Sequence, residues 1–161
     1  LVIGCGNLLR GDDAAGPTVL RLLGERDLRS GVRLVDAGTS GMDVTYLMRG
    51  MRRVILVDAS SLGVPAGTVH RVPASELEGL AAPRGNLHDF TWQEALGFAR
   101  WLLEDDYPRE VSVYLVEGAG FDVGAPLSPE VSAAVERIAD AIVADLSAPD
   151  LRRRTRDGDL A

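Results

Sequence analysis

Short β-branched segments alternate along this chain with longer segments of helical periodicity. The strand-like segments are bounded by Gly, Pro or Asp, and apolar residues recur at spacings of three and four in the segments between them. Parallel strands need long, usually helical, crossover connections, so this alternation is typical of a parallel sheet covered on both faces. The sequence therefore predicts a single-domain α/β fold with five strands in a mostly parallel sheet.

The periodicity places each element. The predicted strands are residues 1–3, 32–35, 53–57, 68–72 and 111–116, and the predicted helices are residues 14–25, 41–50, 91–104 and 128–146. Residues 54–57 are continuously apolar, which predicts a central strand, whereas His70 and Arg71 interrupt the strand at 68–72 and predict a place near an edge. Ser128 before Pro129 predicts a helix start. The folded domain is expected to cover residues 1–146, and the Arg-rich segment 147–161 is expected to be a disordered tail.

Composition excludes several classes of function. The 161 residues carry 24 acidic and 17 basic side chains, a formal charge of −7, which argues against a nucleic-acid partner. Every basic residue other than the two His is Arg, so neither a Schiff-base lysine nor a P-loop lysine is available. A single Cys excludes an intrachain disulfide and fits a reducing cytoplasm. No apolar run approaches the roughly 20 residues of a membrane span, so we expect no membrane association.

The first loop follows a predicted strand and precedes a predicted helix. Gly4 and Gly6 suggest a dinucleotide-binding G-x-G-x-x-G turn, but position 9 is Leu. Asp12 and Asp13, just before the helix, would repel a pyrophosphate. This loop is therefore better suited to a cation than to a nucleotide.

Acidic residues recur at the carboxyl ends of successive predicted strands, as Asp12 and Asp13, Asp36 and Asp58. In a parallel α/β sheet these ends share one edge, where ligands bind, so the carboxylates are expected to converge. Clustered carboxylates stay ionised only if a cation neutralises them. With His88, in a loop before a helix, they form an oxygen and nitrogen ligand set suited to nickel, zinc, manganese or iron.

Each of these residues also has a simpler explanation. Asp13 is a possible helix cap, Asp58 a turn former and His88 a polar residue beside a helix, and each explanation is the commoner one for a residue taken alone. Residues 36–41 are equally consistent with a plain turn and with a ligand-binding loop. Cys5 is better explained as a small buried residue than as a nucleophile.

Taken together, these residues resemble the maturation endopeptidases of nickel-iron hydrogenases. Residues 4–16 (GCGNLLRGDDAAG) are similar to the opening G-x-G-N-x-L-x-x-D-E/D-x-x-G of that family, and residues 36–41 (DAGTSG) to its D-x-G-T-x-G turn. Asp58 matches its strand-ending aspartate and His88 its histidine. Asp13 stands where many members have Glu, which shortens the ligand arm by one methylene.

The resemblance implies a five-stranded twisted sheet between helices and a metal site formed by Asp13, Asp58 and His88. It implies that a C-terminal extension is removed from the hydrogenase large-subunit precursor after nickel insertion. The nickel is then supplied by the substrate, and zinc or cadmium are expected to replace it in vitro.

The same resemblance suggests substrate contacts and leaves the catalytic group open. Asn7, Asp36, Gly38 and Thr39 are the expected substrate contacts. Water is activated either by the metal as a Lewis acid or by Asp36 as a base. Two rival functions remain: a non-catalytic nickel-binding chaperone and a flavodoxin-like nucleotide-binding module.

Overall fold

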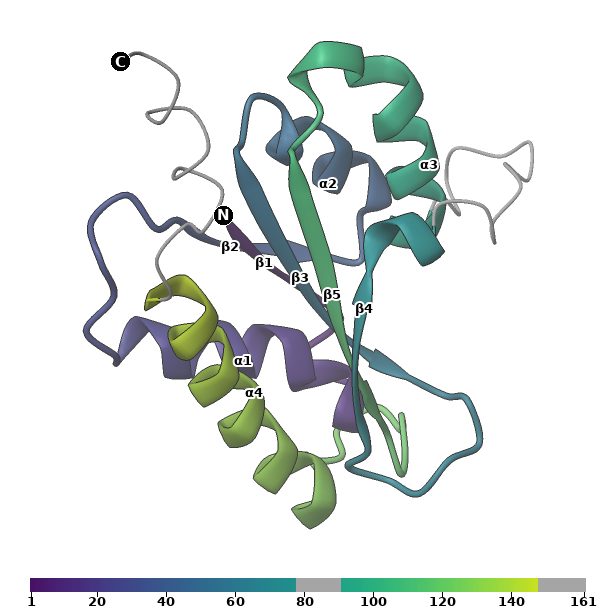
Figure 1. Cartoon of the computed structure of the whole chain (residues 1–161). Coiled ribbons are helices and arrows are strands. Elements are labelled where there is room, and N and C mark those ends of the chain that lie inside the picture. The colour runs from purple at the N-terminus through teal and green to yellow at the C-terminus, as the bar shows by residue number, and fades with distance from the viewer. Residues whose placement is uncertain (78–90, 148–161) are drawn as a thin grey trace.

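The computed structural model describes residues 1–77 and 91–147 and contains a five-stranded sheet in the order β2-β1-β3-β5-β4 (Figure 1). The strands are β1 (Val2–Cys5), β2 (Leu34–Gly38), β3 (Arg53–Ser60), β4 (Val69–Pro73) and β5 (Glu110–Glu117). The first four in spatial order are parallel, and β4 pairs antiparallel with β5. The mostly parallel sheet is confirmed, as are the central position of β3 and the edge position of β4.

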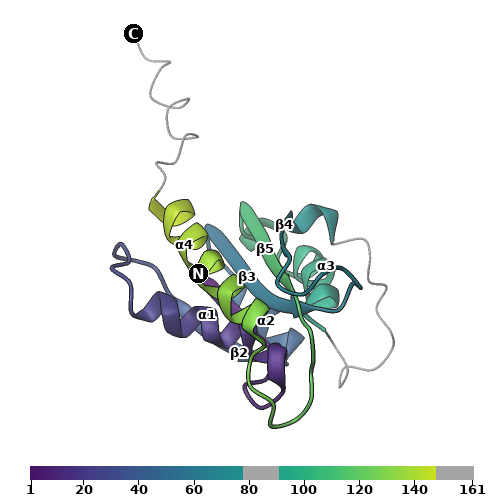
Figure 2. The same cartoon turned by 90° about the horizontal axis from the view of Figure 1, so that it is seen from below.

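Helices cover both faces of the sheet. The helices α1 (Ala15–Gly24) and α4 (Pro129–Ser147) pack on one face, and α2 (Gly41–Met48) and α3 (Trp92–Leu103) on the other (Figures 1 and 2). Alternate residues of β3 point to the two layers, Ile55 to α1 and α4 and Leu56 to α2 and α3. The fold thus has two apolar cores separated by the sheet. No helix within the described ranges combines the length and apolar character that a membrane span requires.

Side-chain caps account for where the helices begin. Ser128 Oγ accepts a hydrogen bond from the Val131 N–H at 3.3 Å, as its place before Pro129 predicts. Thr91 and Glu94 form a reciprocal capping box at the start of α3, and Ser40 caps α2. The starts of α2 and α3 are therefore fixed at the carboxyl edge of the sheet.

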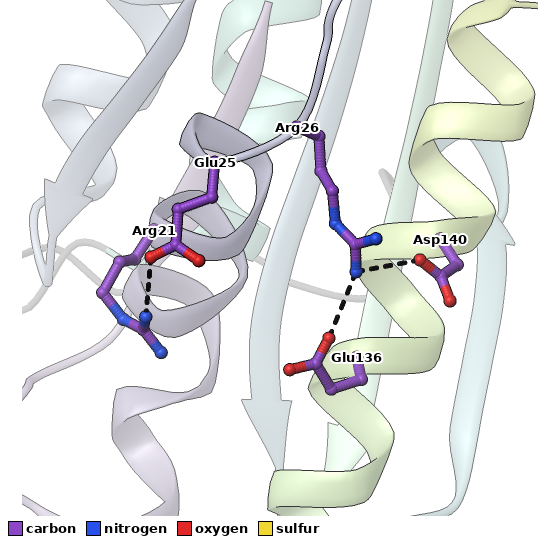
Figure 3. A network of polar contacts seen from close by, with 5 residues as sticks. All are labelled: Arg21, Glu25, Arg26, Glu136 and Asp140. Atoms are coloured by element: carbon purple, nitrogen blue, oxygen red, sulfur yellow. Dashed lines mark hydrogen bonds and ion pairs between the residues drawn. The ribbon is translucent and has the colours of Figure 1, made fainter.

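Ion pairs on the surface link α1 to α4. Arg26, just after α1, contacts Glu136 at 3.2 Å and Asp140 at 3.0 Å, both on α4 (Figure 3). Arg21 pairs with Glu25 at 3.0 Å. All five side chains are exposed, so each pair contributes at most about 1 kcal/mol. The buried layers, not these pairs, hold the helices on the sheet.

Three strands extend further toward the carboxyl edge than predicted. The strand predicted at 1–3 runs to Cys5, the one at 32–35 to Gly38, and the one at 53–57 to Ser60. Asp36 and Asp58 therefore lie inside strands, where Asp36 pairs with Gly4 and Asp58 with Leu115. The prediction ended each strand at its first Gly or Asp, although pairing with a neighbour keeps such residues extended. The tail predicted at 147–161 lies outside the described residues, apart from Ser147, which ends α4.

Candidate functional site

A cavity of about 260 Å³ lies at the carboxyl edge of the sheet, between the starts of α2 and α3. Its lining comes from β1, the turn before α1, the β2–α2 turn, β3 and the start of α3: Cys5, Gly6, Asp13, Gly38, Thr39, Ser40, Gly41, Asp58, Thr91, Trp92 and Gln93. Four of the predicted site residues, Asp13, Gly38, Thr39 and Asp58, meet here. The edge predicted for ligand binding is thus the edge with this cavity.

Glycines let the first loop fold tightly enough to bring Asp13 to the cavity. Gly6 has a φ of +121°, and a Cβ there would lie 2.0 Å from the Asp13 carbonyl oxygen. A Cβ on Gly16 would lie 2.2 Å from the Cys5 carbonyl oxygen. The Asn7 N–H donates to that Asp13 carbonyl at 3.1 Å. The glycine spacing therefore serves the approach of α1 to β1 and closes the loop that carries Asp13.

Asn7 and Asp36, both predicted to touch substrate, lie outside the lining of this cavity. The Asn7 side-chain oxygen accepts the Leu9 N–H at 2.9 Å, and Asp36 Oδ1 accepts the Gly38 N–H at 2.8 Å. Asp36 is exposed and lines a neighbouring cavity beside β2 and α2. In the structure, Asn7 shapes the first loop and Asp36 shapes the turn that leads to Gly38.

Adjacent acids in the 3-10 turn η1 (Gly11–Ala14) have different roles. Asp12 is only 1% exposed and accepts hydrogen bonds from the N–H groups of Ala119 and Ser128, both at 2.7 Å, and of Gly120 at 3.2 Å. Burial raises its pKa, but these N–H groups outweigh burial and hold the pKa below its usual value. The expected convergence of all the acids is therefore wrong for Asp12, which anchors the loop after β5.

Asp58 lies at the cavity wall with both carboxylate oxygens engaged. Oδ1 accepts the Ala59 N–H at 2.8 Å, and Oδ2 accepts the indole N–H of Trp92. Burial raises the pKa of Asp58 to about 6, the two hydrogen bonds oppose that shift, and the charge of Asp13 adds to it. Near neutral pH this carboxylate is poised between its neutral and ionised forms and would gain from a cation.

Cys5 lines the same cavity but is only 4% exposed. Burial, followed by the charges of Asp58 and Asp36, raises the pKa of its thiol. Its thiolate is therefore disfavoured, which fits the packing role expected from the sequence better than a nucleophilic one.

Two of the three predicted metal ligands share the cavity, and the third cannot be placed. Asp13 and Asp58 line it together. His88 lies outside the described residues. Within residues 1–77 and 91–147, no three His, Cys, Asp or Glu side chains are close enough to hold one metal ion. The described part thus offers two carboxylate ligands and open space beside them.

Sequence reasoning placed Trp92 in a helix core and missed its contact with Asp58. Trp92 is 6% exposed and does pack in the α2–α3 core, yet its indole nitrogen reaches the site. A usable signal was present, because a helix that follows a loop from the carboxyl edge begins at that edge. Aromatic residues in its first turn are therefore candidates for the site.

The comparisons with known proteins agree with this geometry. The model of the HycI family, described as hydrogenase maturation protease, matches residues 17–145. Hydrogenase expression/formation protein HupD of Thiocapsa roseopersicina is 34% identical over 145 residues, which is 88% of this chain but only 63% of that relative. A putative hydrogenase maturation protease of Methanocaldococcus jannaschii is 29% identical, over 91% of this chain and 95% of the relative.

Solved structures give the same family. The hydrogenase maturating endopeptidase HybD of Escherichia coli superposes with a TM-score of 0.76 at 26% identity, with 90% of each chain covered. The family model covers most of the residues described here, including both cores and the helix starts that line the cavity. The chain belongs to the hydrogenase maturation protease family.

Proposed function

We propose that this protein removes a C-terminal extension from the large-subunit precursor of a nickel-iron hydrogenase after nickel insertion. Nickel held by the precursor is recognised by Asp13, Asp58 and His88. The observation that carries this proposal is the shared cavity of Asp13 and Asp58, in which each carboxylate disfavours ionisation of the other. The free Cys5 is compatible with the cytoplasm, where we expect the protein to work.

The chemistry of the cavity supports an ion that arrives with the substrate. A divalent cation between Asp13 and Asp58 would replace the proton that Asp58 holds below a pKa of about 6. Two carboxylates and an imidazole leave coordination positions free for the precursor's own ligands. Zinc and cadmium, which accept similar ligands, are expected to bind in vitro.

The position of Asp36 bears on how water is activated. Its carboxylate lines the neighbouring cavity, and one oxygen is held by the Gly38 N–H. A base needs to lie within hydrogen-bond reach of the attacking water. This placement favours the metal as the Lewis acid that activates water over Asp36 as the base.

Intact mass spectrometry tests the proposal directly. The purified protein is incubated with large-subunit precursors in nickel-loaded and nickel-free forms, with casein as an unrelated substrate. We expect one C-terminal fragment from the nickel-loaded precursor alone, because the acidic cavity repels a peptide that brings no cation. Cleavage of nickel-free precursor at the same site and a similar rate would contradict the proposal.

The same experiment separates the rival functions. A nickel-binding chaperone would bind the loaded precursor and leave its mass unchanged. The flavodoxin-like alternative is disfavoured by family membership and by Asp13 at the cavity, where a phosphate would be repelled.

A further inference from the structure

A second cavity, of about 440 Å³, lies beside the site cavity, between the edge strand β2 and the helix α2. We call it the β2 groove. Its apolar lining includes Val35, Leu47 and Met51, and Tyr46 on α2 is 62% exposed beside it. Both the strand and the helix therefore present surface that has no covering element among the described residues.

The open edge of β2 offers backbone hydrogen bonds as well as apolar contacts. Among the described residues β2 pairs only with β1. The carbonyls of Arg33 and Gly38 accept N–H groups of the first strand and its loop, from Val2 and Gly6, both at 2.8 Å. Alternate backbone groups of β2 face the other way, where an added strand could pair with them.

Charges are distributed unevenly along the β2 groove. Asp36 and Asp43 lie toward the end nearest the site, because Asp36 precedes the cavity-lining Gly38 and Asp43 is in the first turn of α2. Arg33, just before β2, and Arg49, just after α2, lie at the far end. Arg49 Nε also pairs with Asp106 at 3.1 Å, and both of these side chains are exposed. The groove therefore suits a ligand that carries a cation at the site end and an anion at the far end.

The groove and the site cavity meet along one continuous piece of chain. Asp36 and Ala37 line the groove, and Gly38 to Gly41 line the site cavity. A peptide that leaves the site past this turn enters the groove directly. Since β2 runs toward the site, a segment that runs away from a bond cut at the site is antiparallel to β2, which is a favourable pairing.

We infer that the β2 groove binds the leaving C-terminal extension of the precursor as an added antiparallel strand, with a carboxylate of that extension at Arg33 and Arg49. This inference rests on the proposed function, which supplies the extension. At about 3.3 Å per residue, the length of β2 accommodates about five residues beyond the cleaved bond. Nickel then positions the bond, and the groove selects the segment that follows it.

Cleavage kinetics test the groove with a matched pair of charge reversals. Arg33→Glu is compared with Arg21→Glu, which makes the same change on the exposed surface of α1. With nickel-loaded precursor, Arg33→Glu is expected to raise KM about tenfold with little change in kcat, and Arg21→Glu to change neither. With a precursor shortened to two residues after the cleaved bond, wild type and Arg33→Glu are expected to be equal. An equal effect of Arg33→Glu on both precursors would overturn the inference.

Photo-cross-linking reads the groove independently of cleavage. A photo-reactive residue at Tyr46 is expected to cross-link to the extension of nickel-loaded precursor, whereas one at Val123, which is 77% exposed in the loop after β5, is not. Cross-linking at Tyr46 without any cleavage by wild type would support the groove and contradict the proposed function. Cleavage without cross-linking to the extension at Tyr46 would retain the function and refute the groove.

Discussion

Asp58 couples the site to the stability of the fold. Its pKa rises from an ordinary 3.8 to about 6 on folding, chiefly through burial. A raised pKa means that the neutral acid is favoured in the folded state, so this contribution to stability is complete below pH 3.8 and is lost as pH rises through about 6. At neutral pH the protein therefore carries a cost for keeping a charged ligand in its cavity.

Asp58→Asn should remove that cost. The variant is expected to gain about 2 kcal/mol in free energy of unfolding at pH 8. The gain should shrink through pH 6 and vanish near pH 4, where the wild-type acid is also neutral. Urea unfolding of both proteins across this range measures it. A gain that does not change with pH would show that ionisation of Asp58 is not its source.

Trp92→Phe should expose the role of the indole N–H, because it keeps an aromatic ring and removes only the donor to Asp58. We expect a loss of about 1–2 kcal/mol in unfolding free energy at pH 8, and a smaller loss at pH 5, where neutral Asp58 needs the bond less. Trp101→Phe is the control, since Trp101 is 71% exposed and should change stability by less than about 0.5 kcal/mol. Equal losses at the two pH values would contradict a bond to the charged form.

At the scale of the element, the turn η1 sends neighbouring carboxylates in opposite directions. Asp12 points into the loop after β5 and satisfies three backbone N–H groups, whereas Asp13 points to the site cavity. One acid therefore maintains the shape of the site's surroundings, and the other is free to meet a ligand.

Alanine variants should separate these roles. Asp12→Ala leaves buried N–H groups without an acceptor and is expected to cost about 3 kcal/mol in unfolding free energy. Asp13→Ala is expected to cost less than about 1 kcal/mol and instead to weaken nickel binding. Thermal unfolding with calorimetric nickel titration tests both. A loss of stability in Asp13→Ala as large as that in Asp12→Ala would show that both acids are structural.

The elements were more predictable than the side chains at their ends. The apolar run at 54–57 predicts the central β3, and Ser128 before Pro129 predicts the start of α4, because each signal is local. The division of labour between Asp12 and Asp13 could not be predicted, because it depends on where the loop after β5 lies in space. The contact of Trp92 with Asp58 was missed for the same reason, since the partners are 34 residues apart.

At the scale of the whole molecule, the sheet separates two cores that relate differently to the site. The α2–α3 core includes Cys5 and Trp92, which also line the site cavity. The α1–α4 core lies on the other face, and α4 contributes no residue to the cavity lining. Both cores stabilise the fold, but only one packs directly behind the site.

Matched truncations in the two cores should therefore differ in function. Leu96 on α3 is fully buried and Ile138 on α4 is 1% exposed, so truncation of either to Ala should cost about 2–4 kcal/mol in unfolding free energy. Leu96→Ala loosens the helix that carries Trp92, so nickel binding should weaken several-fold in conditions where both variants remain folded. Ile138→Ala should bind nickel as wild type does. Urea unfolding and nickel titration on the same samples measure the two effects. If both variants lost nickel affinity equally, the site would depend on global stability rather than on the α2–α3 layer.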